Sequence, residues 1–422
     1  SDKGSPDFET NYGKLGKLKK EVLEIKEESD LIDYPEKAII VDAIFGTGLN
    51  RPPEGIAAKV IEKINQSGAT VVSIDLPSGC FSEDNSDNDL RYVVHSEYVL
   101  TFQVPKLAFY LAESASVIGS VVVLDIGLSD QFLKDIEVTH HLLTTSVVSP
   151  MRRRRRAFDH KGTFGHALMI AGSPGKFGAA LMATESVLKS GAGLVTLHTH
   201  EKGAEILHGF LPEAMVSLDQ KGPEGFSELP DLRPYNAIGV GPGLGKAGET
   251  VKALKLLIQE ARVPLVIDAD ALNILSENLT WLAFLPKGSI LTPHPGEFAR
   301  LTGDKLSHYE SLEAQRELSI KHGIYILLKG GRSSLSLPDG QVLINSTGNP
   351  GMATGGMGDV LTGIITGLLA SGYSSMQAAA LGMFLHGRAG DLALETESHE
   401  SLLPKNLLNY LGRAFDSLSD EN

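Results

Sequence analysis

The sequence predicts a protein of the α/β class with two successive domains, because apolar strands and amphipathic helices alternate through both halves of the 422 residues. Runs such as Ala38–Phe45 are typical of buried parallel strands. The alternation is interrupted at Thr144–Asp159, which contains Pro150 and the consecutive arginines Arg152–Arg156. We interpret that segment as a solvated linker or a salt-bridge segment rather than an anion-binding site. The predicted domains therefore comprise residues 1–145 and 146–422.

The composition favours an enzyme that acts on small molecules. With 38 basic and 52 acidic residues the net charge is −14, which argues against nucleic acid as a partner. No apolar run reaches the roughly 18 residues needed to cross a membrane. The single cysteine, Cys80, excludes an internal disulfide framework. We therefore expect a cytoplasmic enzyme with no membrane or nucleic-acid partner. Its 45 glycines gather in a few clusters, and these clusters guide the search for ligand sites.

In the first domain, strands and helices alternate after a polar beginning that has a short helical pattern around Leu18–Ile25. The strand Ala38–Phe45 leads into a glycine-containing loop, and a helix with one apolar face is predicted at Gly55–Asn65. The next strand, Thr70–Asp75, ends in a Leu-Pro-Ser-Gly turn. Further strands are predicted at Tyr98–Phe102 and Val121–Ile126.

The second domain repeats the alternation with more elements. Its predicted strands are Ala167–Ala171, Leu194–His198, Ala237–Val240, Leu265–Asp268, Ser289–Thr292 and Ile324–Lys329, followed by a hairpin of Leu335–Leu337 and Val342–Ile344. Its predicted helices are Ala179–Ser190, Glu249–Gln259, Asp359–Ser371 and Ser375–Ala389. No internal repeat relates the two halves, so we expect two different α/β domains.

The densest glycine cluster, Asn345–Gly363, has six glycines in 19 residues and leads directly into an apolar helix. Glycines allow a ligand close to the backbone, and the free N–H groups of a helix N-terminus bind anions. Asp359 lies where this helix begins. A lone aspartate there would be an N-cap worth about 1 kcal/mol. Beside a glycine-lined anion site, we favour a catalytic base that deprotonates a hydroxyl group before it attacks a phosphate.

Other motifs also fit structural roles. Gly241–Gly245 follows a strand at the edge where open α/β sheets bind ligands, but it fits a tight turn equally well. His294 fits a structural turn, and Lys329 fits a surface lysine at a strand end. Asp268 and Asp270 suit Mg²⁺ by chemistry. Their spacing at a strand end fits the rim of an active site better than a direct metal pair.

The cluster ending at Asp359 resembles the anion-hole motif of the ribokinase-like superfamily, whose members phosphorylate hydroxyl groups at a Gly-X-Gly-Asp turn. The surrounding motifs resemble those of the NAD(P)H-hydrate dehydratases over roughly residues 150–415. They are His160–Gly165, Gly178–Ala180, Gly191–Val195, Gly241–Gly245, Ile267–Asn273, Leu291–Glu297 and Leu328–Gly331. The resemblance implies a ribokinase-like second domain preceded by a Rossmann-like first domain.

The same resemblance implies roles for individual residues. Asp359 would be the catalytic base. The hydrated nicotinamide nucleotide would be bound by Ala179, Ala180, Gly243, His294 and Asp359. The adenine nucleotide would be bound by Lys329, Gly330, Gly331, Arg332, Ser333, Gly355, Gly356 and Gly358.

The implied reaction repairs hydrated NADH or NADPH, the substrates NADHX and NADPHX. ADP with Mg²⁺ would phosphorylate the added hydroxyl group, and elimination of phosphate would restore the reduced ring, with AMP and phosphate as products. Such chemistry needs positioning and charge neutralisation, which suit the glycine loop and Lys329. The alternative among enzymes is a ribokinase-like small-molecule kinase with a stable phosphorylated product. We also expect a homo-oligomer, because members of the family often assemble.

The first half resembles NAD(P)H-hydrate epimerase over about residues 7–140. The matching motifs are Val41–Leu49, Ser73–Gly79, Phe102–Lys106 and Leu124–Gly127. By this resemblance, Asp42 and Ser78 would ligate K⁺, and Asp75 would be a catalytic residue facing the substrate. The nucleotide phosphates would be held by Gly46, Thr47, Gly48, Leu49, Asn50, Arg51 and Pro52. A structural role explains Asp42 poorly, since a buried charge needs a partner, whereas Asp75 and Ser78 also fit turn caps.

One departure from the epimerase pattern concerns the start of the chain. The family's first domain begins with a further strand and an Asn-Asn-Gly-Gly-Asp-type loop, which supplies another K⁺ ligand and much of the nucleotide site. No such loop occurs in these 422 residues. We therefore expect an N-terminally incomplete first domain, weak or absent epimerase activity in this polypeptide, and a sheet edge that is exposed or completed by another chain. An alternative is that the first domain is a non-catalytic binding module.

Overall fold

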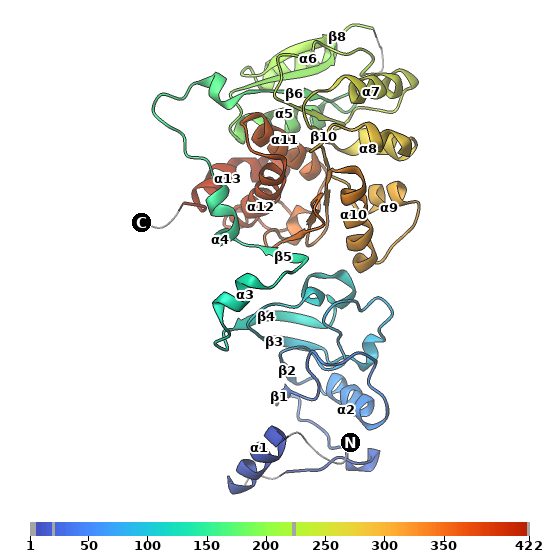
Figure 1. Cartoon of the computed structure of the whole chain (residues 1–422), viewed down its shortest axis with the longest axis vertical. Coiled ribbons are helices and arrows are strands. Elements are labelled where there is room, and N and C mark those ends of the chain that lie inside the picture. Colours follow the sequence, from blue (N-terminus) through green and yellow to red (C-terminus); the bar gives the residue numbers. More distant parts are fainter. Residues whose placement is uncertain (1–5, 19–21, 222–224, 420–422) are drawn as a thin grey trace. The chain divides into compact units, whose positions relative to one another are not determined.

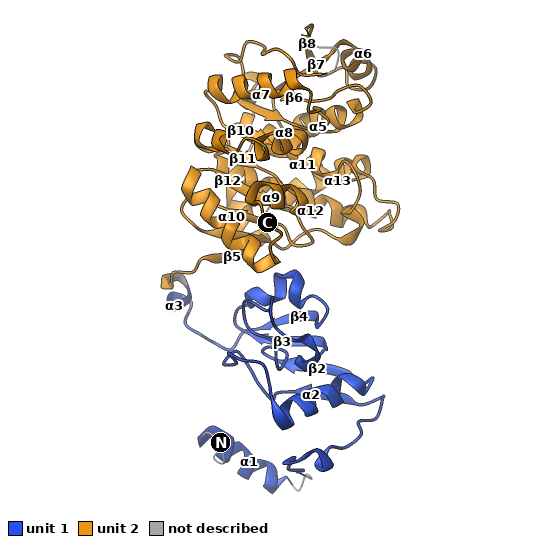
Figure 2. Cartoon of the chain, turned by 90° about the vertical axis from the view of Figure 1, so that its right-hand side faces the viewer, with its two compact units in different colours: residues 1–133 blue, residues 134–422 orange. Residues whose placement is uncertain are grey.

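A computed structural model describes residues 6–18, 22–221 and 225–419. The chain forms two compact units, Ser1–Leu133 and Lys134–Asn422 (Figure 2). Residues 134–145, which we predicted in the first domain, therefore belong to the second unit. The reason is a strand pairing, because β5 (His140–Leu143) joins the second sheet beside β14 (Val342–Asn345).

The first unit is built on a parallel sheet with the strand order β1-β2-β3-β4 (Figure 1). Its strands are β1 (Ile39–Asp42), β2 (Thr70–Ile74), β3 (Ser96–Phe102) and β4 (Ile118–Leu124). Its helices are α1 (Pro6–Lys17) and α2 (Gly55–Gln66), and α3 (Asp130–Asp135) spans the boundary between the two units. β1 forms one edge of the sheet, and its Ile39 is 71% exposed.

Two details of this unit differ from the sequence prediction. The helix predicted around Leu18–Ile25 is wrong where it can be compared: Leu18 and Val22–Ile25 are not helical, residues 19–21 lie outside the described residues, and α1 ends earlier. The strand predicted to reach Phe45 ends at Asp42. It ends there because the Asp42 carboxylate accepts the N–H of Ile44 and the Ser78 hydroxyl accepts the N–H of Phe45, so these groups do not join the strand ladder.

The second unit contains a ten-stranded sheet with the order β5-β14-β13-β12-β11-β10-β9-β6-β7-β8. The remaining strands are β6 (His166–Ile170), β7 (Leu194–His200), β8 (Met215–Asp219), β9 (Ala237–Val240), β10 (Leu265–Ile267), β11 (Ile290–Leu291), β12 (Tyr325–Leu328) and β13 (Ser334–Ser336). β13 pairs antiparallel with β12 and β14, which confirms the predicted hairpin, and the other pairs are parallel.

Helices cover both faces of this sheet, so the unit has three layers (Figure 1). One core contains residues of α5 (Phe177–Lys189), α6 (Glu201–Phe210), α11 (Met357–Ala370), α12 (Ser375–Ala393) and α13 (Pro404–Asp416). The other contains residues of α7 (Gly248–Glu260), α8 (Ala269–Ser276), α9 (Pro295–Thr302) and α10 (His308–His322). The short α4 (Thr145–Val148) follows β5. The α/β class and its parallel sheets are as predicted.

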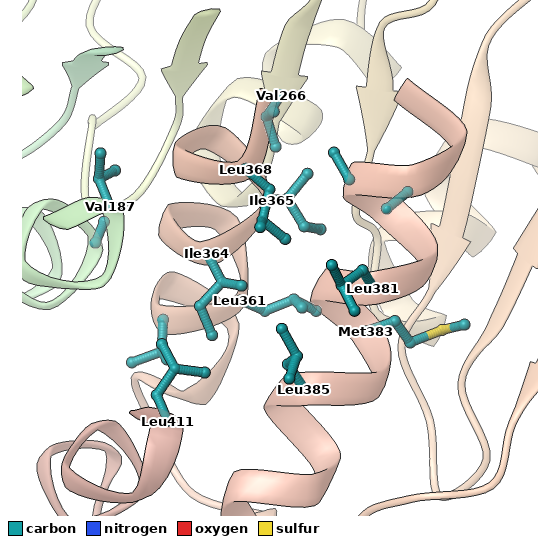
Figure 3. Packing of buried hydrophobic residues seen from close by; sticks show 14 of the residues in the cluster. Val187, Val266, Leu361, Ile364, Ile365, Leu368, Leu381, Met383, Leu385 and Leu411 are labelled. Carbon is teal, nitrogen blue, oxygen red and sulfur yellow. The ribbon is translucent and has the colours of Figure 1, made fainter. Parts of the chain in front are cut away.

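Helix α11 is the central element of the first of these cores. Figure 3 shows Leu361 and Ile364 of α11 packed between Val187 of α5 and Leu385 of α12. A Cβ atom on Gly363 would lie 2.1 Å from the backbone oxygen of Ala183, so only glycine allows α5 this close. This packing fixes the helix whose first turn carries Asp359.

The strand order brings the sequence motifs to one edge of the second sheet. β9, β10, β11 and β12 are parallel neighbours, so their carboxyl ends lie side by side. Gly241, Asp268, Lys329 and the turn containing His294 follow these ends. In the part of the chain that the structure describes, no helix is long and apolar enough to span a membrane.

Candidate active sites

Lys329 lies at the centre of the candidate site in the second unit. Its Nζ donates to Asp268 Oδ1 at 2.7 Å and lies 3.9 Å from Glu297 Oε2. The other oxygen of Asp268 accepts the Thr362 hydroxyl at 2.7 Å, so the Asp268 carboxylate, 1% exposed, is held from both sides. Burial favours a lower pKa for Lys329, but Asp268 and Glu297 outweigh it and raise that pKa. Lys329 is therefore a fixed cation, not a surface lysine.

Asp359 lies in the first turn of α11, close to this cation. Burial raises the pKa of Asp359 to about 7, and repulsion from Asp268 adds to the effect, while the charge of Lys329 opposes it. A carboxyl group with a pKa near neutrality can hold a proton and release it at physiological pH. Asp359 is thus electrostatically suited to act as a general base.

The glycine loop before α11 is shaped by backbone geometry and by a distant side chain. Gly356 has a φ of 97°, in the left-handed region, and a Cβ atom on Gly358 would lie 3.1 Å from Lys329 Nζ. The carboxylate of Asp391, on α12, accepts the Gly348 N–H and the Asn349 side-chain amide, each at 3.0 Å. The loop is therefore anchored to α12 at the end opposite Lys329.

Two cavities meet at Asp359. The larger has a volume of about 930 Å³ and is lined by the predicted adenine-nucleotide residues and His294. These residues are Lys329, Gly330, Gly331, Arg332, Ser333, Gly355, Gly356 and Gly358. The smaller, of about 430 Å³, is lined by Ala179 and Gly243 among others. Both cavities include Ala269, Glu297 and Asp359. The predicted residue Ala180 lies elsewhere, with its side chain buried in the core at 1% exposure.

His294 has a structural role that the sequence left open. Its Nδ1 accepts the N–H groups of Gly296 and Glu297, and Glu297 in turn accepts the N–H of His294, so the pair forms a capping box at the start of α9. The His294 side chain is nevertheless 51% exposed and lines the larger cavity. Burial raises the pKa of Glu297, whereas Lys329 lowers it.

Asp268 and Asp270 point to different partners and do not form a metal pair. Asp270 receives the Lys176 ammonium at 3.0 Å and the Gly245 N–H at 2.8 Å. Between them, Ala269 has a φ of 48°, which is costly for a residue with a Cβ atom and typical of functional sites. The described residues contain no group of three or more His, Cys, Asp or Glu side chains able to hold a metal ion.

In the first unit, the structure brings Asp42 and Ser78 together. The Asp42 carboxylate is 1% exposed and accepts the Ser78 N–H at 2.8 Å, the Ser78 hydroxyl at 2.5 Å and the Ser73 hydroxyl at 2.7 Å. Among the described residues, the groups that donate hydrogen bonds to Asp42 are all neutral. A buried carboxylate surrounded by neutral donors still favours a nearby cation.

Asp75 forms a second carboxylate site in this unit. It has a φ of 67°, which is strained for a non-glycine residue, and its carboxylate accepts Lys106 Nζ at 2.7 Å. A Cβ atom on Gly46 would lie 3.8 Å from Asp75 Oδ2, so the predicted phosphate-binding loop starts beside this carboxylate. Of that loop, Thr47, Gly48, Asn50, Arg51 and Pro52 are exposed and Leu49 is half-buried.

Some functional side chains were missed by the sequence reasoning. Thr362 and Asp391 have no local motif, because each acts on a residue far away in the chain. Lys106 belongs to a recognised motif, but only the fold reveals that it binds Asp75.

Sequence comparisons agree with this geometry. The profile of the NAD(P)H-hydrate dehydratase family matches residues 167–413, and that of the YjeF-related protein N-terminus matches residues 1–108. The bifunctional NAD(P)H-hydrate repair enzyme of Moorella thermoacetica is 38% identical over 398 residues, which cover 91% of this chain and 74% of the relative. The enzyme of the same name from Escherichia coli is 32% identical over 395 residues, covering 93% and 74%.

The ADP/ATP-dependent NAD(P)H-hydrate dehydratase of Bacillus subtilis, solved after co-crystallization with ATP and Mg²⁺, is similar to the second unit. It is 32% identical, covers 66% of this chain and 98% of its own, and has a TM-score of 0.58. A ribokinase-like superfamily protein from Enterococcus faecalis is 28% identical, with 67% and 98% coverage and a TM-score of 0.57.

Fold and site together define a two-domain α/β enzyme whose second unit is ribokinase-like, with a carboxylate next to a glycine-lined helix N-terminus. The chain belongs to the family of bifunctional NAD(P)H-hydrate repair enzymes.

Proposed function

We propose that the second unit dehydrates the S form of hydrated NADH or NADPH with ADP as phosphoryl donor, and that the first unit serves to interconvert the R and S hydrates. The observation that carries the proposal is the meeting of two cavities at Asp359, whose pKa is raised to about 7. A donor nucleotide in one cavity and a hydrated dinucleotide in the other would place the phosphoryl group and the hydroxyl group on either side of this carboxylate.

The chemistry follows from the charges around that meeting point. Asp359 accepts the proton of the substrate hydroxyl group as it attacks the terminal phosphate of ADP. Lys329, held by Asp268, and the free N–H groups at the start of α11 stabilise the charge on the transferring group. Phosphate, a far better leaving group than hydroxide, then leaves the ring carbon. The neighbouring ring carbon loses a proton to solvent, which restores the double bond, and NAD(P)H, AMP and phosphate are released.

Mg²⁺ would be bound at this site mainly through the phosphates of the nucleotide. It prefers to be bound through substrate phosphates and one or two carboxylates, and the described residues offer no larger protein cluster. Glu297, which lines both cavities, is the carboxylate that would hold it beside the nucleotide phosphates. When bound, it would neutralise the phosphate chain. Ala179 and Gly243 would contact the hydrate in the smaller cavity, and His294 would contact it from the wall of the larger cavity. Lys329–Ser333 with Gly355, Gly356 and Gly358 would contact the adenine nucleotide in the larger cavity.

For the first unit, we propose that Asp42 and Ser78 hold K⁺ and that Asp75 faces the substrate. Asp42 fits a monovalent cation because it is buried among neutral donors. Asp75 fits a proton-transfer residue because Lys106 contacts its carboxylate at 2.7 Å, in a strained backbone position next to Gly46. The cytoplasmic location and the homo-oligomeric state stay predictions.

The decisive experiment incubates the 422-residue chain with prepared S hydrate and ADP or ATP and follows recovery of the near-ultraviolet absorbance of reduced nicotinamide. Recovery that depends on the nucleotide, with AMP formed from ADP, supports the proposal. A stable phosphorylated product without recovery would instead identify a small-molecule kinase. Supplying the R hydrate alone tests the first unit, and no conversion of R to S hydrate is the outcome expected of a binding module.

A further inference from the structure

Four residues of the arginine-rich segment, Arg152–Arg155, line a cavity in the second unit with a volume of about 1390 Å³. This cavity shares no lining residue with the two cavities at Asp359. Figure 1 shows the segment leaving α4 and running along the outside of the second unit, past α13, before it returns to β6. The cavity lies between this segment and the body of the unit.

Hydrogen bonds and ring contacts tie three arginines to the body, and carboxylates take little part. Arg153 donates to the backbone oxygen of Ser371 at 2.7 Å and lies over the ring of Tyr373. Arg155 donates to the backbone oxygen of Gly191 at 2.7 Å and lies over the ring of Phe164. Each of these guanidinium groups has five N–H donors and uses few of them here, and neither is neutralised by the carbonyl it binds.

The cavity therefore has an excess of positive charge. Arg152, Arg153, Arg154, Arg155 and Lys189 line it. Among the described residues, two carboxylates pair with this set, Asp416 with Arg152 and Glu185 with Lys189, each at 3.4 Å. Five cations and two carboxylates leave an excess of three positive charges in a protein whose net charge is −14.

Arg154 is the side chain in this set that is free to bind. It is exposed, and among the described residues it has no hydrogen bond, ion pair or ring contact. Guanidinium groups with unused N–H donors bind phosphate oxygens, often through two hydrogen bonds at once. Among the described residues, Arg154 has no partner, and the arginines beside it have donors left over. Hydroxyl groups on the wall, including those of Ser190 and Tyr373, add further hydrogen-bonding capacity.

The same two helices connect this cavity to the candidate active site. Asp359 is in the first turn of α11 and Ser371 is at its end, and Ala179 and Lys189 lie near the two ends of α5. At 1.5 Å per residue, the helix between Asp359 and Ser371 spans about 18 Å. The arginine-lined cavity is thus a separate site and not an extension of the phosphoryl-transfer site.

We propose that the cavity lined by Arg152–Arg155 and Lys189 binds an anion with a chain of two or more phosphates, at one site per protein chain. The shared chemistry is the polyphosphate chain, whether it comes from a nucleotide or from inorganic polyphosphate. This proposal replaces our interpretation of the segment as a solvated linker, because Arg152–Arg155 line a cavity and, among the described residues, only Arg152 of these four pairs with a carboxylate. The proposal does not depend on the dehydratase activity.

The test is calorimetric titration of the full chain with inorganic tripolyphosphate. The wild type is expected to bind one equivalent more than a variant that combines Arg154→Ala with Lys189→Ala. Arg233→Ala combined with Lys221→Ala removes the same number of positive charges from surface ion pairs with Asp231 and Glu228 and is the matched control, which should bind like the wild type. Equal binding by the wild type and the double variant would overturn the proposal, and so would equal losses in the double variant and the control.

Two further measurements sharpen the result. Titration with ATP distinguishes the sources: binding at this site at least tenfold tighter than that of tripolyphosphate identifies a nucleotide, and equal binding identifies the phosphate chain, either of which supports the site. The double variant should keep the wild-type kcat and KM for ADP in the dehydratase assay. A rise in KM for ADP that accounts for the lost equivalent would place that equivalent at the active site and overturn the proposal.

Discussion

Replacing Asp359 with asparagine should abolish turnover and, at the same time, make the second unit more stable at alkaline pH. The two effects have one cause. The environment of Asp359 raises its pKa from 3.8 to about 7, so the ionised form needed for catalysis is the form that the folded protein holds less favourably. A side chain that cannot ionise loses the base and also avoids this cost.

The size of the stability effect follows from linkage. Because the folded pKa is raised, the folded state binds a proton that the unfolded chain has already lost between about pH 4 and pH 7, and stability falls as the pH rises through that window. At 1.36 kcal/mol per pKa unit, the cost of the wild-type aspartate is about 4 kcal/mol at pH 8 and about 2 kcal/mol at pH 5. Asp359→Asn should therefore gain more stability at pH 8 than at pH 5.

Urea unfolding followed by tryptophan fluorescence measures this effect in the correct unit, because the single tryptophan, Trp281, lies in the second unit. Asp304→Asn is a suitable control, since Asp304 is exposed in the same unit. In the dehydratase assay, Asp359→Asn should lower kcat by about 10²–10⁴-fold with ADP binding largely kept. The wild-type rate should fall about tenfold per pH unit well below pH 7. Retention of more than about a tenth of the rate would refute the base role.

Three further substitutions test the rest of the arrangement. Lys329→Met leaves the buried Asp268 without its cation and should cost about 3–5 kcal/mol in the Trp281 unfolding assay; an unchanged urea midpoint would contradict the central ion pair. Asp391→Ala removes two hydrogen bonds that anchor the loop at Gly348, so the KM for ADP should rise about tenfold while kcat changes less, and an unchanged KM would rule out the anchoring role. Asp42→Ala should leave the rate with S hydrate at the wild-type value, because the two units have separate sites; a loss of rate would show that they are coupled.

Much of the fold could be predicted because most parallel strands are apolar runs with turns at their ends, whereas β5, which begins with His140 and His141, was not predicted. Ala237–Val240 was predicted with the bounds that β9 has in the structure. The predictions failed where the local sequence pattern does not determine where a helix or strand begins or ends. Helix α1 carries Phe8, Tyr12 and Leu15 at helical spacing but buries none of its residues, and the prediction placed the helix later in the chain. The run Ala38–Phe45 is apolar on both sides of Asp42, and the hydrogen bonds that Asp42 and Ser78 accept end the strand earlier.

The site could be predicted as a set of motifs but not as a set of contacts. The motif residues follow parallel strands, whose carboxyl ends meet at one edge of the sheet, so their gathering is a consequence of the fold class. The pairing of Lys329 with Asp268 joins residues 61 positions apart, and the hydrogen bond from Thr362 spans 94. No local spacing specifies such contacts, because they depend on how α11 packs against the sheet.

The contacts also explain why Asp359, and not a neighbouring carboxylate, has the pKa suited to a base. Lys329 is the cation shared by Asp268, Glu297 and Asp359. Asp268 takes the short contact of 2.7 Å and a hydroxyl donor as well, and its charge raises the pKa of Asp359. Glu297 already accepts a hydrogen bond from the N–H of His294. Burial and repulsion from neighbouring carboxylates both raise the pKa of Asp359, while Lys329, the cation that lowers it, is already bound to Asp268. Asp359 also lines both cavities. Removal of the Asp268 charge by Asp268→Asn should therefore lower the pH at which the dehydratase rate is half-maximal, even though Asp268 itself transfers no proton.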